Sequence, residues 1–113
     1  MSFRSGGVKS WVMQRLSAVY IAVFLSFFLF SLFTSTPTDF TQWNNWLALP
    51  LINVAFIIFW IAVIVHAWIG ARDVIMDYVH DDTLRFLVLS MLGMFLIFML
   101  VWVIKVLIMV STA

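Results

Sequence analysis

Three long runs of apolar residues restrict the fold of this chain more than any other feature of its sequence. Residues 16–33 and 47–65 carry no charge, and residues 84–110 carry only Arg85 at the start and Lys105 near the end. A helix that crosses a bilayer needs about 20 predominantly apolar residues. The sequence therefore predicts an all-α integral membrane protein with three transmembrane helices, over residues 12–34, 46–76 and 83–110. We expect residues 1–113 to form a single membrane-anchor domain.

The composition agrees with lipid as the solvent. Apolar residues make up 65% of the chain and charged residues 10%, against about 45–50% and about 25% in soluble domains. A soluble fold of 113 residues could not hide so much apolar surface from water. A net charge of +1 gives no reason to expect a nucleic-acid partner, and the lack of Cys excludes disulfides and iron–sulfur ligation.

The distribution of Lys and Arg predicts the orientation. Arg4, Lys9 and Arg15 precede or begin the first span, Arg72 and Arg85 flank the second connection, and the first connection has no positive residue. Short loops rich in Lys and Arg stay in the cytoplasm. We therefore expect the N-terminus and the second connection to face the cytoplasm, and the C-terminus to face the periplasm.

Two ionisable residues lie at the predicted inner ends of neighbouring spans. His66 is near the inner end of the second span and Arg15 is at the inner start of the first, each within about one turn of the boundary. Ionisable groups at such depths are costly and usually functional. Small residues, Ala62 and Gly70, lie one turn from His66 on the same helical face, where they leave room for a flat ligand or for a second helix.

His66 by itself admits two explanations. The more common one is a hydrogen bond across the bundle to a Ser hydroxyl or a carbonyl, and the other is axial ligation of haem iron. Arg15 favours the second, because a guanidinium binds haem propionates well, although alone it is better explained by the positive-inside rule. If His66 does bind haem, His80 is poorly placed as the second ligand, since a continuous helix would put it about 21 Å away. The other ligand would then come from another polypeptide.

Asp77 and Tyr78 follow His66 on the cytoplasmic side. A Tyr hydroxyl near the interface can donate a hydrogen bond to a quinone carbonyl, with a nearby carboxylate to orient it. Spacing alone favours the simpler interpretation of an interfacial Tyr beside a solvated acidic loop.

Residues 66–70, His-Ala-Trp-Ile-Gly, followed by Asp77-Tyr78-Val79, carry a family resemblance. With three spans and an Arg before the first, the whole chain resembles the hydrophobic membrane anchor subunits of bacterial succinate dehydrogenase, respiratory complex II. Residues 80–83, His-Asp-Asp-Thr, depart from the basic, Pro-containing turn of such relatives.

The resemblance implies specific roles in a complex of the bacterial inner membrane. His66 would be an axial ligand of haem b, Arg15 would approach a haem propionate, and Tyr78 with Asp77 would contact ubiquinone. It also implies three partners: a cytochrome b556 subunit giving the other axial His, an iron–sulfur subunit and a flavoprotein subunit. The chain would be a non-catalytic anchor in the tricarboxylic acid cycle and in electron transport. The anchor of a fumarate reductase, or a small proton-conducting helical bundle that depends on His66, remain as alternatives.

Overall fold

The computed structural model describes residues 7–112, so Arg4 lies outside the described residues. That range forms four helices and no strand: α1 (Val8–Thr34), α2 (Phe40–Ala48), α3 (Pro50–Tyr78) and α4 (Asp82–Thr112). α1, α3 and α4 are each long and apolar enough to cross a membrane, since 27 residues already extend about 40 Å. The prediction of an all-α chain with three candidate membrane spans is confirmed. The orientation of the two ends remains a prediction.

The short helix α2 was not predicted. We expected residues 34–39 to lead as a turn into a span that begins near residue 46, whereas the second long helix begins only at Pro50. Asp39 caps α2 by accepting a hydrogen bond from the Gln42 backbone N–H at 2.8 Å, and Gln42 Oε1 accepts one from the Thr38 N–H at 2.9 Å. This arrangement resembles a capping box. Pro at the first position of a helix is favourable because that N–H has no partner within the helix.

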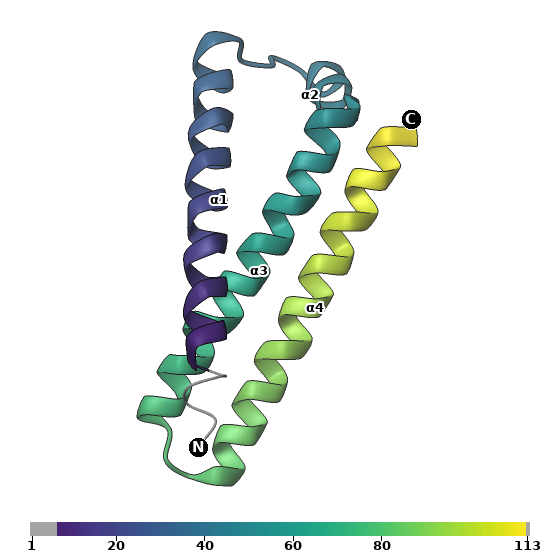
Figure 1. The fold of residues 1–113 in the computed structure, drawn as a ribbon. Coiled ribbons are helices and arrows are strands. Elements are labelled where there is room, and N and C mark those ends of the chain that lie inside the picture. Colours follow the sequence, from purple (N-terminus) through teal and green to yellow (C-terminus); the bar gives the residue numbers. More distant parts are fainter. Residues whose placement is uncertain (1–6, 113) are drawn as a thin grey trace.

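The helix α3 lies in the middle of the molecule. It packs against α1 on one side and α4 on the other, while α1 and α4 do not contact each other within the described residues (Figure 1). α2 packs across the end of this arrangement, against both α3 and α4. The result is an elongated body with extents of 50 × 24 × 20 Å.

Aromatic side chains hold α1 against α3. Phe24 of α1 is only 6% exposed, and its ring centroid lies 4.8 Å from that of Phe59 and 4.9 Å from that of Phe56. Tyr20 donates a hydrogen bond from its hydroxyl to the Ala55 carbonyl at 2.9 Å. Tilted and edge-on aromatic pairs of this kind stabilise a contact beyond the area they bury.

A buried amide of α3 joins this helix to its other two neighbours, α2 and α4. Asn53, which is 6% exposed, donates from Nδ2 to the Leu47 carbonyl of α2 at 3.0 Å and to the Leu107 carbonyl of α4 at 2.8 Å. Further along the same interface, Trp68 of α3 covers Gly93 of α4, where an added Cβ would lie 3.6 Å from the indole ring. In lipid the hydrophobic effect does not favour contact between helices. Close packing at small residues and interhelical hydrogen bonds stabilise their association instead.

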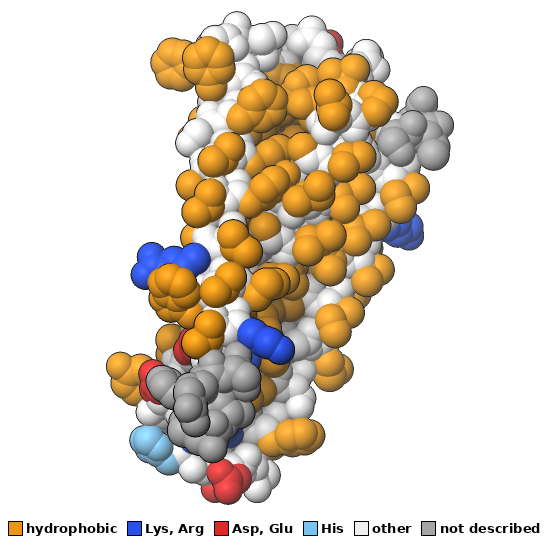
Figure 2. Space-filling view, viewed as in Figure 1, with side chains coloured by type: hydrophobic (Ala, Val, Ile, Leu, Met, Phe, Trp, Pro, Cys, Tyr) orange, Lys and Arg blue, Asp and Glu red, His pale blue; other side chains and the backbone are white. Residues whose placement is uncertain are grey.

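The exterior is apolar along most of its length. Figure 2 shows hydrophobic side chains over the middle of the molecule and acidic side chains mainly at the end that carries the α3–α4 turn. Four of the five Asp residues lie between residues 73 and 82. A surface of this kind is suited to lipid or to other membrane helices, with the turn at a membrane–water boundary.

Candidate functional site

His66 lies on α3 where that helix meets α1. Its Nδ1 is 3.1 Å from the hydroxyl oxygen of Ser17, which is 7% exposed. The same hydroxyl donates a hydrogen bond to the Gln14 carbonyl at 3.0 Å. The hydrogen bond to a Ser across the bundle, the simpler of our two explanations for this imidazole, is therefore present in the structure.

The two contacts of the Ser17 hydroxyl favour one tautomer of the imidazole of His66. A hydroxyl has one hydrogen, and the Gln14 carbonyl can only accept. Both contacts are hydrogen bonds only if Ser17 donates to Gln14 and accepts from Nδ1–H of His66. In the neutral ring this leaves the lone pair on Nε2.

The other ring nitrogen of His66, Nε2, is not completely enclosed by the chain. Nε2 has no hydrogen-bond partner among the described residues, and it is not among the side-chain atoms that the chain encloses. A metal-bound imidazole almost always donates its other N–H to an oxygen, which is the arrangement that the two contacts of Ser17 favour. The donor set at His66 therefore fits axial ligation of a haem iron, and the bond to Ser17 does not compete with it.

Gly70, one turn beyond His66, allows the two helices to approach closely. An added Cβ there would lie 3.4 Å from Nε2 of the Gln14 side chain. Of the two uses that we expected for small residues near His66, Gly70 serves the packing of a second helix. The Oε1 atom of Gln14 is buried and has no hydrogen-bond partner within residues 7–112.

Arg15 lies level with His66, but its side chain does not point toward that residue. It is two residues, or about 3 Å of helix rise, from Ser17, so it lies level with His66. Its side chain is exposed, and its guanidinium carbon lies 5.2 Å from the centroid of the Trp11 ring. Several residues of α1 contact α3, among them Gln14, Ser17, Tyr20 and Phe24. No hydrogen bond or ion pair between Arg15 and α3 is found among the described residues. The structure thus brings His66 to Ser17, and Arg15 points toward what surrounds the chain.

Asp77 and Tyr78 form the last turn of α3 and are both exposed, Tyr78 to 77%. Neither makes a side-chain hydrogen bond with any residue that the structure describes. Asp77 lies three turns, about 16 Å, beyond His66 along α3. His80 follows in the turn before α4 and is also exposed.

Two arginines link the helices at the end of the molecule that carries these residues. Arg85 of α4 donates to the carbonyls of Val79 at 3.0 Å and Met76 at 3.3 Å, where the last turn of α3 lacks intrahelical donors. Arg72 donates to the Ser10 hydroxyl of α1 at 2.9 Å and lies 3.3 Å from the Asp73 carboxylate. These contacts hold the end of α3, which carries the exposed Tyr78, against α1 and α4.

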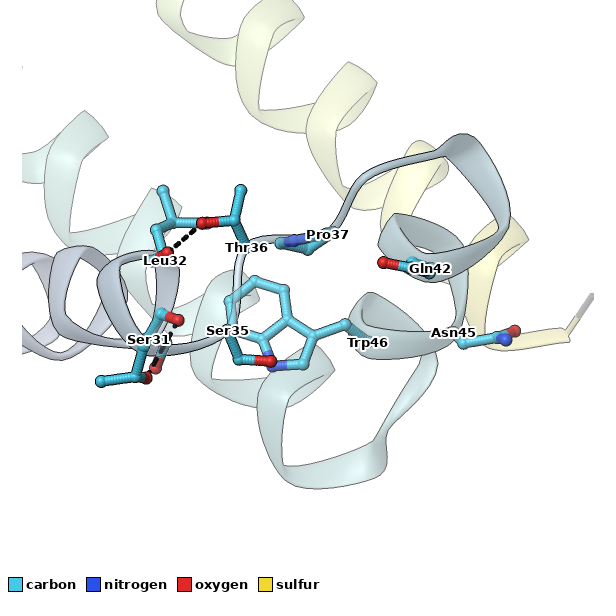
Figure 3. A pocket seen from close by; sticks show the side chains of 9 residues that line it. Ser31, Leu32, Ser35, Thr36, Pro37, Gln42, Asn45 and Trp46 are labelled. Atoms are coloured by element: carbon cyan, nitrogen blue, oxygen red, sulfur yellow. Dashed lines mark hydrogen bonds between the residues drawn. The ribbon is translucent and has the colours of Figure 1, made fainter.

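A polar pocket lies at the opposite end, where α1 leads into α2. Its volume is about 450 Å³, and Figure 3 shows the Trp46 ring lying across it near Pro37. Hydroxyl and amide side chains line much of it, and no ionisable group does: the lining residues are Ser31, Leu32, Thr34, Ser35, Thr36, Pro37, Gln42, Asn45 and Trp46. Ser31 is about 21 Å along α1 from Ser17, so this pocket is separate from the surroundings of His66.

Ser17 and Gln14 are site residues that we did not predict from the sequence. A usable signal was present, because both are uncharged polar residues at the inner end of a span, beside Arg15. Buried polar groups require partners, and the only imidazole within a predicted span was the obvious one to consider.

Comparison with known proteins identifies the family of the chain. Residues 2–104 match the family model described as the succinate dehydrogenase/fumarate reductase transmembrane subunit. The succinate dehydrogenase hydrophobic membrane anchor subunit of Coxiella burnetii is 25% identical over 99 residues, which cover 88% of this chain and 86% of that protein. The resemblance identified from residues 66–70 and 77–79 is confirmed. The chain belongs to the family of transmembrane subunits of succinate dehydrogenase and fumarate reductase.

Proposed function

We propose that this chain is the membrane anchor subunit of a succinate dehydrogenase, succinate:ubiquinone oxidoreductase, in which it holds one side of haem b and part of a ubiquinone site. The observation that carries the proposal is the contact of His66 Nδ1 with the Ser17 hydroxyl, which leaves Nε2 without a hydrogen-bond partner among the described residues. The family model matches nearly the whole chain. Family membership implies a respiratory complex in which such an imidazole nitrogen would bind haem iron.

In this proposal, His66 supplies one axial nitrogen, and Arg15 pairs with a haem propionate. Arg15 is level with His66 and exposed, so its guanidinium is free to meet a group that lies outside this chain. A guanidinium binds a carboxylate through two parallel hydrogen bonds. When bound, haem b supplies reversible one-electron transfer, and the chain supplies position and electrostatics.

The second axial ligand would come from a cytochrome b556 subunit. His80 is exposed in the turn beyond α3, on the far side of Asp77 and Tyr78 from His66. The chain therefore contributes one imidazole at the haem and requires a partner helix for the other. Iron–sulfur and flavoprotein subunits would complete the complex, oxidising succinate and passing electrons to the membrane part.

Tyr78 and Asp77 would form this chain's share of the ubiquinone site at the cytoplasmic face of the bacterial inner membrane. The Tyr78 hydroxyl is free to donate to a quinone carbonyl, and the adjacent Asp77 carboxylate can accept or relay a proton there. Because Tyr78 is 77% exposed, this chain offers one wall of the site and the partners close the rest.

An anchor of a fumarate reductase is the nearest alternative, since the family model covers both enzymes. The two differ in the direction of the reaction and in the quinone. The relative from Coxiella burnetii carries the succinate dehydrogenase name, which favours the first assignment.

A reduced-minus-oxidised difference spectrum of the assembled complex tests the haem assignment. We expect His66→Ala to abolish the b-type signal, because it removes an axial ligand. His80→Ala is the matched control, since it removes the other imidazole of the chain and should leave the spectrum unchanged. An undiminished signal in the His66→Ala complex would exclude this residue as a haem ligand.

A further inference from the structure

The Ser17 hydroxyl has two neighbours and can satisfy both in only one way. It lies 3.0 Å from the Gln14 carbonyl and 3.1 Å from Nδ1 of His66. If Ser17 donated to Nδ1 instead, its oxygen would face the Gln14 carbonyl oxygen at hydrogen-bond distance with no proton between them. The arrangement without that repulsion is a chain that runs from His66 Nδ1–H to Ser17 and from Ser17 to Gln14.

We propose that Ser17 is a positioning residue for His66: by accepting a hydrogen bond from Nδ1–H it fixes the tautomer and the orientation of the ring, so that the lone pair of Nε2 is available to a haem iron. This inference rests on the proposed haem ligation and extends it to a residue of α1. It makes the haem contact of α3 depend on the packing of α1 against α3.

Burial of Ser17 protects its hydrogen bond with His66 from competition by water. Ser17 is 7% exposed, so water does not compete for its hydroxyl as it would at an open surface. Nδ1 of His66 has no other hydrogen-bond partner among the described residues. Separation of the pair would leave Nδ1 of His66 without a hydrogen-bond partner in the described part of the chain, which is unfavourable where water has little access.

The hydrogen bond also changes the ligand chemically. An imidazole whose N–H is donated to an oxygen is a more basic ligand through its other nitrogen. A more basic ligand favours ferric over ferrous iron. Loss of the bond should therefore raise the midpoint potential of haem b, and loss of ring orientation should weaken haem retention.

The test compares Ser17→Ala with Ser17→Thr in the assembled complex. Ala removes the hydroxyl, whereas Thr keeps it. For Ser17→Ala we expect about 10- to 100-fold weaker haem retention, the usual effect of losing such an outer partner, together with an upward shift of the midpoint potential. Ser17→Thr should restore both toward wild type. Ser26→Ala, on an exposed position of the same helix, is the matched control and should change neither. A wild-type potential and wild-type retention in Ser17→Ala would overturn the proposal.

A second measurement needs neither a variant at Ser17 nor haem. In the full-length chain labelled with 15N-histidine, the imidazole nitrogen shifts report which nitrogen is protonated, and His80→Ala identifies the signals of His66. We expect the neutral ring of His66 to carry its proton on Nδ1. A proton on Nε2 would overturn the proposal even if Ser17→Ala fails to assemble.

The two proposals fail in different ways. A wild-type complex without haem b, or a b-type signal that survives His66→Ala, would refute the haem ligation itself. A haem signal that depends on His66 but is indifferent to the Ser17 hydroxyl would refute only the positioning role.

Discussion

Tyr78 and His66 have contrasting surroundings although both belong to α3. His66 is half-buried and bonded to Ser17, whereas Tyr78 is exposed and its hydroxyl has no partner in the part of the chain that the structure describes. The hydrogen-bond partner of His66 therefore belongs to this chain. A partner for the Tyr78 hydroxyl would come from other subunits or from a bound molecule.

The proposed role of Tyr78 leads to a prediction about activity. In the assembled complex, Tyr78→Phe should reduce ubiquinone reduction about 10- to 100-fold, at or below the lower end of the roughly 10²–10⁴ that a positioned proton donor contributes. Succinate oxidation with an artificial dye should be unaffected, because the dye takes electrons before the membrane part. The measurement is a comparison of the two activities in one preparation.

Tyr20→Phe is the matched control. Tyr20, the other tyrosine of the chain, bonds to the Ala55 carbonyl between α1 and α3 and lies far from Tyr78. We expect both activities to survive its loss. Equal quinone reduction in Tyr78→Phe and wild type would contradict the quinone assignment.

At the residue scale, the sequence predicted the depth of His66 and Arg15 but not their directions. The contact with Ser17 shows that the part of α1 near Arg15 and the part of α3 near His66 lie level, as we expected. The face of α1 that meets α3 could not be predicted, because nearly every face of this helix is apolar. In lipid an apolar face gains little by turning toward another helix, so polar pairs such as Ser17 and His66 set the rotation instead.

At the element scale, Asn53 ties three helices together. Its amide is buried in α3 and bonds to carbonyls of α2 and α4. α2 is only nine residues long, and helices of that length are not stable alone. Its position therefore depends on contacts such as this one.

Removal of this amide should weaken the association of the helices. We expect Asn53→Ala to lower the free energy of unfolding in detergent by about 1–2 kcal/mol, since interhelical hydrogen bonds in membranes average about 0.6 kcal/mol each with a maximum near 1.7. Asn45→Ala, an exposed position on α2, should change it by less than about 0.5 kcal/mol. An equal effect of the two substitutions, measured by denaturant titration, would show that the Asn53 hydrogen bonds contribute nothing specific.

The long helices were easier to predict than the short one for a physical reason. A membrane span is recognised by its length and hydropathy, whereas α2 is amphipathic, short and rich in Asn and Trp. Its start did carry a signal: Asp39 followed three residues later by Gln42 is a capping pattern. Pro37 just before it favours a turn, so the sequence alone does not separate a capped helix from a polar connection.

At the scale of the whole molecule, the positive-inside rule predicts that the α3–α4 turn faces the cytoplasm and the α1–α2 connection faces the periplasm. The chain has no Cys, so single cysteines can be introduced on a clean background. We expect Ser35→Cys to react with a membrane-impermeant maleimide in intact spheroplasts, and His80→Cys to react only after permeabilisation. The unmodified chain is the control, and the reverse labelling pattern would invert the topology.

The separation of α1 from α4 on either side of α3 has a consequence for biogenesis. Every group of this chain that we assign to the haem belongs to α1 or α3, and the Ser17–His66 pair joins just those two helices. As synthesis proceeds from the N-terminus, this half-site can close while α4 is still inside the ribosome. A nascent chain with the proposed haem site would therefore present the Nε2 nitrogen of His66 to a waiting partner before its own last helix enters the bilayer.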